Sequence, residues 1–227
     1  MDISYSVKRS SKRTKITITV ERDRTVVVQA PNRASDEAIA RIVKAKRYWI
    51  YEKTGHGQKY SDRPHPPGKE LVNGESALYL GRRYRIEIVD DATECIRFDQ
   101  RFLVPASCAS HKKGAMREWY IARARERILP RVVKQARELG VSFGRARIVD
   151  SRYRWGSCTV HDNINLNWRL IKAPIFVVDY VIAHELAHLL EPNHTPRFWN
   201  IVKTQVPTMD RARSWLRDHG QILEEEV

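Results

Sequence analysis

The sequence predicts an α+β protein, and three of its features lead to that prediction. Short stretches in the first hundred residues alternate polar with β-branched side chains, which is typical of strands. Residues 112–139 carry apolar side chains at helical spacing, and the apolar run 175–183 predicts a buried helix. We therefore expect an antiparallel β-rich region with one helix over residues 1–108. The second region, residues 109–227, should pack a short mixed sheet on the buried helix.

The N-terminal region should begin with a small antiparallel sheet followed by a helix. The predicted strands are Ile3–Val7, Lys15–Val20 and Thr25–Gln29. Ser35 is placed to cap a helix that runs to about Lys53. The stretch 54–69 holds three glycines and three prolines, so it should form a linker or an exposed loop.

Two longer strands and a series of helices should follow. Leu78–Val89 and Glu94–Val104 are expected to pair in a hairpin around Asp90 and Asp91. Pro130 should kink or split the helix predicted at 112–139. The remaining predicted elements are strands at Ala146–Val149 and Asn163–Trp168, and helices from about Pro174, from Thr195 to Val202 and from Asp210 to about Ile222.

The stretch from His184 to His188, with the sequence His-Glu-Leu-Ala-His, is the most informative motif of the chain. Residues four apart lie on the same face of a helix, so His184 and His188 can bind one metal ion. Glu185 follows the first ligand directly, where its carboxylate can reach a water on the open side of the metal. Two histidines and a glutamate on a buried helix are costly unless partners or a metal satisfy them.

A third histidine follows the predicted end of this helix. Pro192 and Asn193 should end the helix and bring His194 back toward the metal. Three protein ligands with one open position are typical of catalytic zinc, whereas structural zinc usually has four. A glutamate from 224–226 is the alternative third ligand, but it lies in a charged tail, so His194 is preferred. We predict one Zn²⁺ per chain, although three imidazoles also suit nickel, cobalt or copper.

A longer pattern surrounds the histidines and resembles a known family. It comprises Arg154–Cys158 (Arg-Trp-Gly-Ser-Cys), Asn165–Trp168 (Asn-Leu-Asn-Trp), the motif from His184 to His194, and Phe198-Trp199. This pattern resembles the YgjP-like metallopeptidases, and its core is similar to the SprT-type and WLM-type zinc proteases. The resemblance implies a zincin-type catalytic domain over residues 109–227, with zinc on the three histidines and Glu185 as the base. It does not imply a particular substrate.

The expected chemistry is hydrolysis of a peptide bond in a peptide or protein substrate. Glu185 would take a proton from the attacking water and pass it to the leaving amine. Candidates for stabilising the oxyanion, chosen because they lie near the motif in sequence, are Arg154, His161 and Arg197.

The strand predicted at 163–168 is expected to be an edge strand above the metal that pairs with an extended substrate. Its polar face would carry Asn163, Asn165 and Asn167, which alternate with apolar residues. The alternative is a half-exposed strand that does not contact the substrate.

The net charge of +14 suggests an anionic partner. Lys and Arg outnumber Asp and Glu by 14 to 6 in residues 1–60 and by 9 to 3 in residues 111–139. A basic N-terminal half and a basic helix 112–139 could contact nucleic acid, although a solvated surface would have the same composition. A DNA-associated zinc protease is therefore one alternative function, and a non-catalytic, metal-stabilised binding module is another.

Cysteine content and hydropathy bear on the compartment. The three cysteines are scattered, which suggests a reducing environment without a disulfide framework. No apolar run approaches the length of a membrane span, and the first twenty residues do not form a signal peptide. We expect a cytoplasmic protein without a membrane partner.

Overall fold

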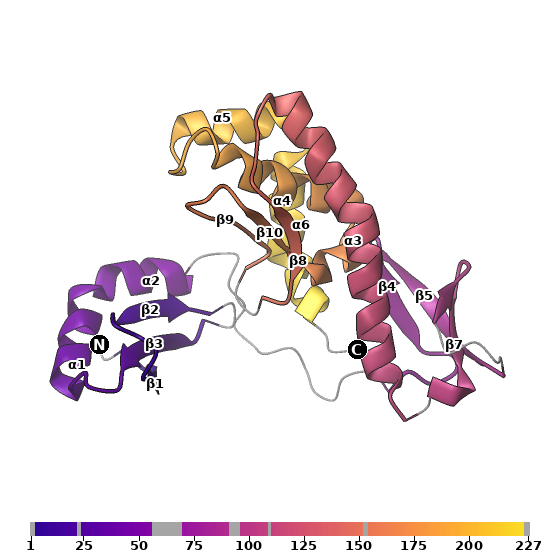
Figure 1. Cartoon of the computed structure of the whole chain (residues 1–227), viewed down its shortest axis with the longest axis horizontal. Helices are drawn as coiled ribbons and strands as arrows, with labels where there is room; N and C mark the ends of the chain where they lie inside the picture. Colours follow the sequence, from indigo (N-terminus) through magenta and orange to yellow (C-terminus); the bar gives the residue numbers. More distant parts are fainter. Residues whose placement is uncertain are drawn as a thin grey trace. The chain divides into compact units, whose positions relative to one another are not determined.

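The computed structural model describes residues 3–21, 24–55, 70–90, 96–108, 110–151 and 154–224 (Figure 1). The chain divides into two compact units, residues 1–63 and 64–227, and each is described separately. The part of the predicted loop from 56 to 69 lies outside the described residues. Both units mix helices with small sheets, which confirms the α+β fold class.

The first unit contains a three-stranded sheet with mixed strand directions. Its strands are β1 (Ser6–Ser10), β2 (Thr17–Val20) and β3 (Val26–Pro31), in the order β1-β3-β2. β2 and β3 are antiparallel as predicted, but β1 is parallel to β3, so the expected all-antiparallel sheet is wrong. β3 lies between β1 and β2 and pairs with both. The alternation of side chains identifies strands, but it does not show which strands pair or in which direction.

Two helices follow where one was predicted. Ser35 caps α1 (Asp36–Ala45), and its hydroxyl accepts a hydrogen bond from the N–H of Ala38 at 3.2 Å. α1 ends at Lys46, and α2 (Arg47–Gly55) begins at the next residue. The core of this unit joins side chains of β2, β3 and both helices: Val20, Val26, Val28, Ala30, Ile39, Val43 and Ile50.

The second unit begins with the sheet β4-β5-β7-β6. Its strands are β4 (Ser76–Tyr79), β5 (Arg82–Val89), β6 (Arg97–Phe98) and β7 (Phe102–Pro105). The predicted hairpin between Leu78–Val89 and Glu94–Val104 is wrong, because β5 and β7 are parallel. The antiparallel pairs are β4–β5 and β6–β7. The first of these turns at Leu80 and Gly81, whose φ angles are 48° and 82°, inside the stretch predicted as one strand.

This sheet shares a core with the long helix α3 (Lys112–Leu139). The rings of Tyr79, Phe102 and Trp119 pack edge-to-face, with Tyr79 and Phe102 each 5.1 Å from Trp119. The hydroxyl of Tyr120 also donates a hydrogen bond to the carbonyl of Leu78 at 2.7 Å. These contacts place the sheet in the same unit as α3, so the structure divides at 63/64 and not at the expected 108/109.

α3 is one continuous helix that includes Pro130, so the predicted split does not occur. It ends at Gly140, which adopts the left-handed conformation (φ 70°) that glycine tolerates best. α3 lies between the sheet β4-β5-β7-β6 and the other sheet of this unit, β8-β10-β9 (Figure 1).

The second sheet is built from β8 (Ala146–Val149), β9 (Gly156–Cys158) and β10 (Ile164–Asn167). β10 is central, parallel to β8 and antiparallel to β9. The strand predicted at 163–168 is therefore present, but its expected position at the edge is wrong. The segment Gly156–Cys158, which is not among the predicted strands, forms the edge strand β9.

The C-terminal part is helical. A short 3-10 helix, η2 (Trp168–Lys172), leads into α4 (Ile175–Ala187), which is followed by α5 (Pro196–Gln205), α6 (Met209–His219) and the 3-10 helix η3 (Gly220–Glu224). Arg131 of α3 donates two hydrogen bonds to Asp179 of α4, at 2.8 and 2.9 Å, and so fixes α4 on α3. Among the residues described, no helix is long and apolar enough to cross a membrane.

The carboxylate of Asp150 connects the end of β8 to α3 and η2. Asp150, directly after β8, accepts hydrogen bonds from Arg117 of α3 and from Arg169 of η2. Burial raises the pKa of this carboxyl, but the hydrogen bonds from both arginines outweigh burial and lower the pKa to about 2. The ionised carboxylate therefore stabilises the folded state.

Asp150→Asn is expected to lower the free energy of unfolding at pH 7 by about 1 kcal/mol. The full pKa shift would correspond to about 2.5 kcal/mol, but the side chain is 41% exposed, and solvent screening reduces this contribution. Because the folded pKa is lowered, the stabilisation is complete above pH 4 and disappears as the pH falls toward 2. Urea unfolding at pH 7 and pH 3 should show the difference reduced by about half at pH 3. An equal difference at both values would contradict this assignment.

Candidate metal centre and active site

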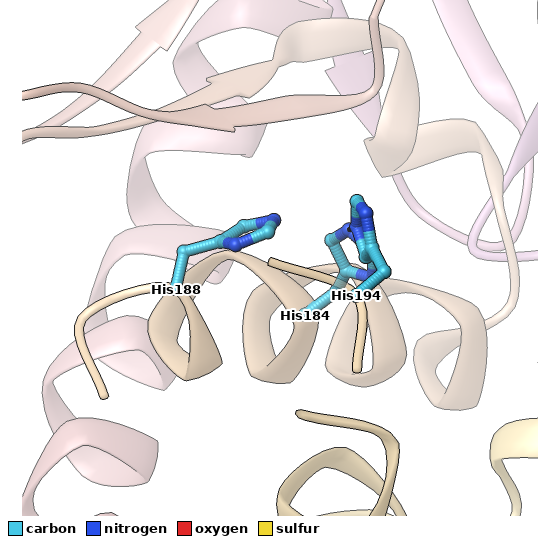
Figure 2. A group of neighbouring side chains, drawn as sticks. All are labelled: His184, His188 and His194. Carbon is cyan, nitrogen blue, oxygen red and sulfur yellow. Dashed lines mark hydrogen bonds between the residues drawn. The ribbon is translucent and has the colours of Figure 1, made fainter. Parts of the chain in front are cut away.

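The three predicted ligands come from one helix and the loop that follows it. His184 lies in the last turn of α4, and His188 caps the C-terminus of the same helix. His194 lies on the loop that precedes α5, directly before Thr195, the N-cap residue of α5. Figure 2 shows the three imidazoles gathered on one side of α4.

The imidazole nitrogens converge closely enough to share one ion. The three candidate ligand atoms lie within 4.8 Å of one another. The Nε2 atoms of His184 and His194 are 3.1 Å apart. Tetrahedral zinc with Zn–N distances of about 2.0–2.1 Å places its ligand nitrogens about 3.4 Å apart. The donor set and its spacing therefore fit a zinc ion.

Burial favours the neutral form of His184 and His188. Burial, with the nearby His188 and His194, lowers the pKa of His184 to about 3. Burial also lowers the pKa of His188, whose ring donates hydrogen bonds to the backbone carbonyls of Glu191 and Pro192. Neutral imidazole is the form that binds a metal, and such carbonyl contacts orient the ring. Both features suit metal ligands.

The alternative third ligand lies elsewhere. Glu224 belongs to η3, and its carboxylate lies 3.9 Å from the guanidinium of Arg169. Glu225 and Glu226 lie outside the described residues. The potential metal-binding group on the described residues comprises the three histidines.

Glu185 is buried against the edge strand β9. Its side chain is on α4, and the residue is only 6% exposed. The backbone N–H of Cys158 donates a hydrogen bond to its carboxylate. Burial raises the pKa of Glu185 to about 8, although this hydrogen bond and the charge of Arg154 act in the opposite direction. The buried carboxyl is therefore more basic than a solvent-exposed glutamate, as suits a group that accepts a proton.

Gly156 provides the space for this carboxylate. A Cβ atom at position 156 would lie 2.6 Å from both Cγ and Oε1 of Glu185. No side chain larger than a hydrogen fits there unless the strand or the glutamate moves. Sequence analysis missed this residue, although a glycine inside a strand often marks the close approach of another group.

The sequence matches a known family of metallopeptidases. Residues 14–219 match the model of the YgjP-like metallopeptidase domain. The chain belongs to the YgjP-like family. A solved structure, the metallopeptidase zymogen of Pyrococcus abyssi abylysin, is similar at 21% identity and a TM-score of 0.37. That match covers 42% of this chain and 92% of the abylysin chain. No curated protein matches the chain.

The three asparagines predicted to face a substrate, two on β10 and Asn163 directly before it, differ in their surroundings in this YgjP-like protein. Asn167 is buried, and its amide donates hydrogen bonds to the carbonyls of Ser151 (2.7 Å) and Arg154 (3.1 Å). Its Oδ1 accepts a hydrogen bond from the N–H of Arg169, so this side chain caps η2 and has a structural role. Asn165 donates to the hydroxyl of Ser157 on β9 at 3.3 Å. Asn163 is half-buried.

The three candidates for oxyanion stabilisation are all exposed. Arg154 precedes β9 and is near enough to Glu185 to lower its pKa. His161 lies in the turn between β9 and β10, and Arg197 lies in the first turn of α5. Of the three, Arg154 is the one whose charge acts on an active-site group.

Proposed function

We propose that this YgjP-like protein is a zinc-dependent peptidase in which His184, His188 and His194 hold the metal and Glu185 is the general base. One observation carries the proposal: three imidazoles converge beside the end of the helix that also carries Glu185, whose carboxyl is buried. A metal that only stabilised the fold would not require this glutamate. Three ligands also leave the fourth position of a tetrahedral ion open to water, as catalytic zinc sites do.

The metal and the side chains would have different roles in hydrolysis. A bound zinc ion would polarise the substrate carbonyl and lower the pKa of a coordinated water. Glu185 would accept a proton from that water and donate it to the leaving amine. The N–H of Cys158 holds the carboxylate in place, and burial keeps bulk water away from it.

The substrate would lie along β9 and not along β10. Hydrogen bonds from Thr159 to Asn163 and from Asn167 to Trp155 place the peptide groups of Thr159 and Trp155 toward β10. Peptide groups alternate in direction along an antiparallel strand, so those of Gly156 and Cys158 face away from the sheet. The N–H of Cys158 is bound to Glu185, so the N–H and C=O of Gly156 and the C=O of Cys158 are the groups that would pair with an extended peptide beside Glu185.

Hydrolysis of unfolded casein by the full-length chain tests this proposal. Cleavage should stop when the metal is removed with 1,10-phenanthroline and return when about one equivalent of zinc is restored. Cleavage that persists in the chelator, after metal analysis shows that no zinc remains, would contradict a zinc mechanism.

Nucleic-acid binding stays a prediction, and exposed aromatic rings favour the first unit over α3 as its site. Four cations of α3 pair with acidic neighbours: Arg117, Arg123, Arg131 and Lys134. On α2, Tyr48 is 75% and Tyr51 is 46% exposed, and the guanidinium of Arg47 lies 4.9 Å over the Tyr48 ring. Exposed rings beside cations are typical of single-strand binding. Retention on single-stranded DNA that weakens steeply with salt would support this prediction, and no retention at low salt would contradict it.

A further inference from the structure

His194, the third proposed ligand, does not belong to α4, which fixes the backbone of His184 and His188. His184 and His188 belong to the helix or its cap, whereas His194 is exposed on a loop with its neighbours Pro192 and Asn193. A loop side chain can adopt several rotamers, and fixing one of them for metal binding costs conformational entropy. A contact that holds the ring before the metal arrives would reduce this cost.

Trp199 makes such a contact from the second turn of α5. Its ring stacks on the imidazole of His194, with centroids 5.5 Å apart and an interplanar angle of 24°. The neighbouring Phe198 is buried, and its ring lies 4.7 Å from those of His188 and His194. Because Thr195 caps α5 directly after His194, the stacked tryptophan is fixed on a helix that begins beside the ligand it contacts.

Arg213, from a different helix, holds the tryptophan. The guanidinium carbon of Arg213 on α6 lies 4.7 Å from the centroid of the Trp199 ring. This is within the range of a cation–π interaction, for which the indole ring is the best partner. Arg213 on α6 therefore contacts Trp199, and Trp199 stacks on the loop ligand His194; the Trp199 ring also lies 5.8 Å from that of His184, at a tilt of 56°.

We propose that Trp199, held by Arg213, is a positioning residue that fixes His194 in the orientation for binding the metal. This proposal rests on the proposed function, because it requires that the three histidines bind zinc. It gives the aromatic pair after the histidines a role beyond core packing. Neither Trp199 nor Arg213 needs to contact the substrate.

The test measures zinc affinity in the full-length chain, by competition with a chromophoric chelator, together with the visible spectrum of the cobalt-substituted protein. Trp199→Leu removes the stack and should weaken zinc binding about 10–100-fold and reduce the absorption bands of tetrahedral cobalt. Trp199→Phe keeps an aromatic ring and should retain most of the affinity. Arg213→Gln should weaken binding to a smaller extent, and should have little further effect when Trp199 is already leucine.

Trp215→Leu is the matched control, because Trp215 is a half-buried tryptophan of α6 whose ring packs against His219. It should lower stability without changing zinc affinity. If Trp199→Leu does not fold, Arg213→Gln decides the question. The positioning role would be overturned if both Trp199→Leu and Arg213→Gln bind zinc with wild-type affinity. If Trp199→Leu does not fold, wild-type affinity in Arg213→Gln would overturn it. Either result would leave the proposed function intact. A wild-type protein that binds no zinc would overturn the proposed function itself.

Discussion

Glu185→Gln is expected to lower kcat for casein hydrolysis by about 10³–10⁴-fold, because the amide cannot accept a proton from the attacking water. The substitution is nearly isosteric, so the packing against Gly156 and the fold should persist. The three histidines are unchanged, and zinc content should stay at about one per chain. The measurement is kcat with metal content on the same preparation.

Glu191→Gln provides the control for this substitution. Glu191 follows α4, and its contact with His188 uses the backbone carbonyl and not the carboxylate. This variant should therefore retain wild-type activity and zinc. Casein hydrolysis by Glu185→Gln within tenfold of wild type would contradict the general-base role and favour a metal-stabilised binding module that lacks catalysis.

Gly156→Ala is expected to lower kcat about 10²-fold while zinc stays bound. The added Cβ would lie 2.6 Å from Glu185, so the carboxylate or β9 must shift by about an ångström. A displacement of this size at a reacting group costs about two orders of magnitude in rate. Metal binding should persist, because the methyl group contacts the base and not the ligands. Kinetics and zinc analysis of the purified variant check both expectations.

Gly114→Ala is the matched control, since a Cβ at position 114 of α3 meets nothing within 4 Å. It should be fully active and slightly more stable, because alanine favours a helix over glycine. If Gly156→Ala is as active as Gly114→Ala, the close approach of Gly156 to Glu185 has no catalytic importance.

The local parts of the site could be predicted from the sequence. The spacing of His184 and His188 follows directly from helical periodicity, and the apolar run before them predicted the buried helix α4. His194 could be preferred over Glu224 because it follows the helix closely, whereas residues 224–226 lie in a charged tail. These inferences depend on residues close together in sequence, and the structure brings the same three histidines together.

The pairing of strands could not be predicted in this way. Alternation identified β10, but it does not show that β8 and β9 flank the strand on both sides. The same limit explains the parallel pairs β1–β3 and β5–β7, since each joins strands that are not adjacent in sequence. The buried role of Asn167 depends on carbonyls of Ser151 and Arg154, which its polar character alone does not reveal.

The contacts that complete the site are also long-range. Gly156 approaches Glu185 from another element, and Arg213 contacts Trp199 from α6. The sequence around a glycine in Trp-Gly-Ser or an arginine in a basic helix does not single out either residue. Their importance follows only from the three-dimensional packing of β9, α5 and α6 around α4.

The most direct test of the central claim is the zinc content of the purified wild-type protein beside His188→Ala, with casein hydrolysis measured on both. The account predicts about one zinc per chain and cleavage in the wild type, with both lost in His188→Ala because two imidazoles hold the ion too weakly. A wild-type protein that binds no zinc, even after zinc is added back, would contradict the account.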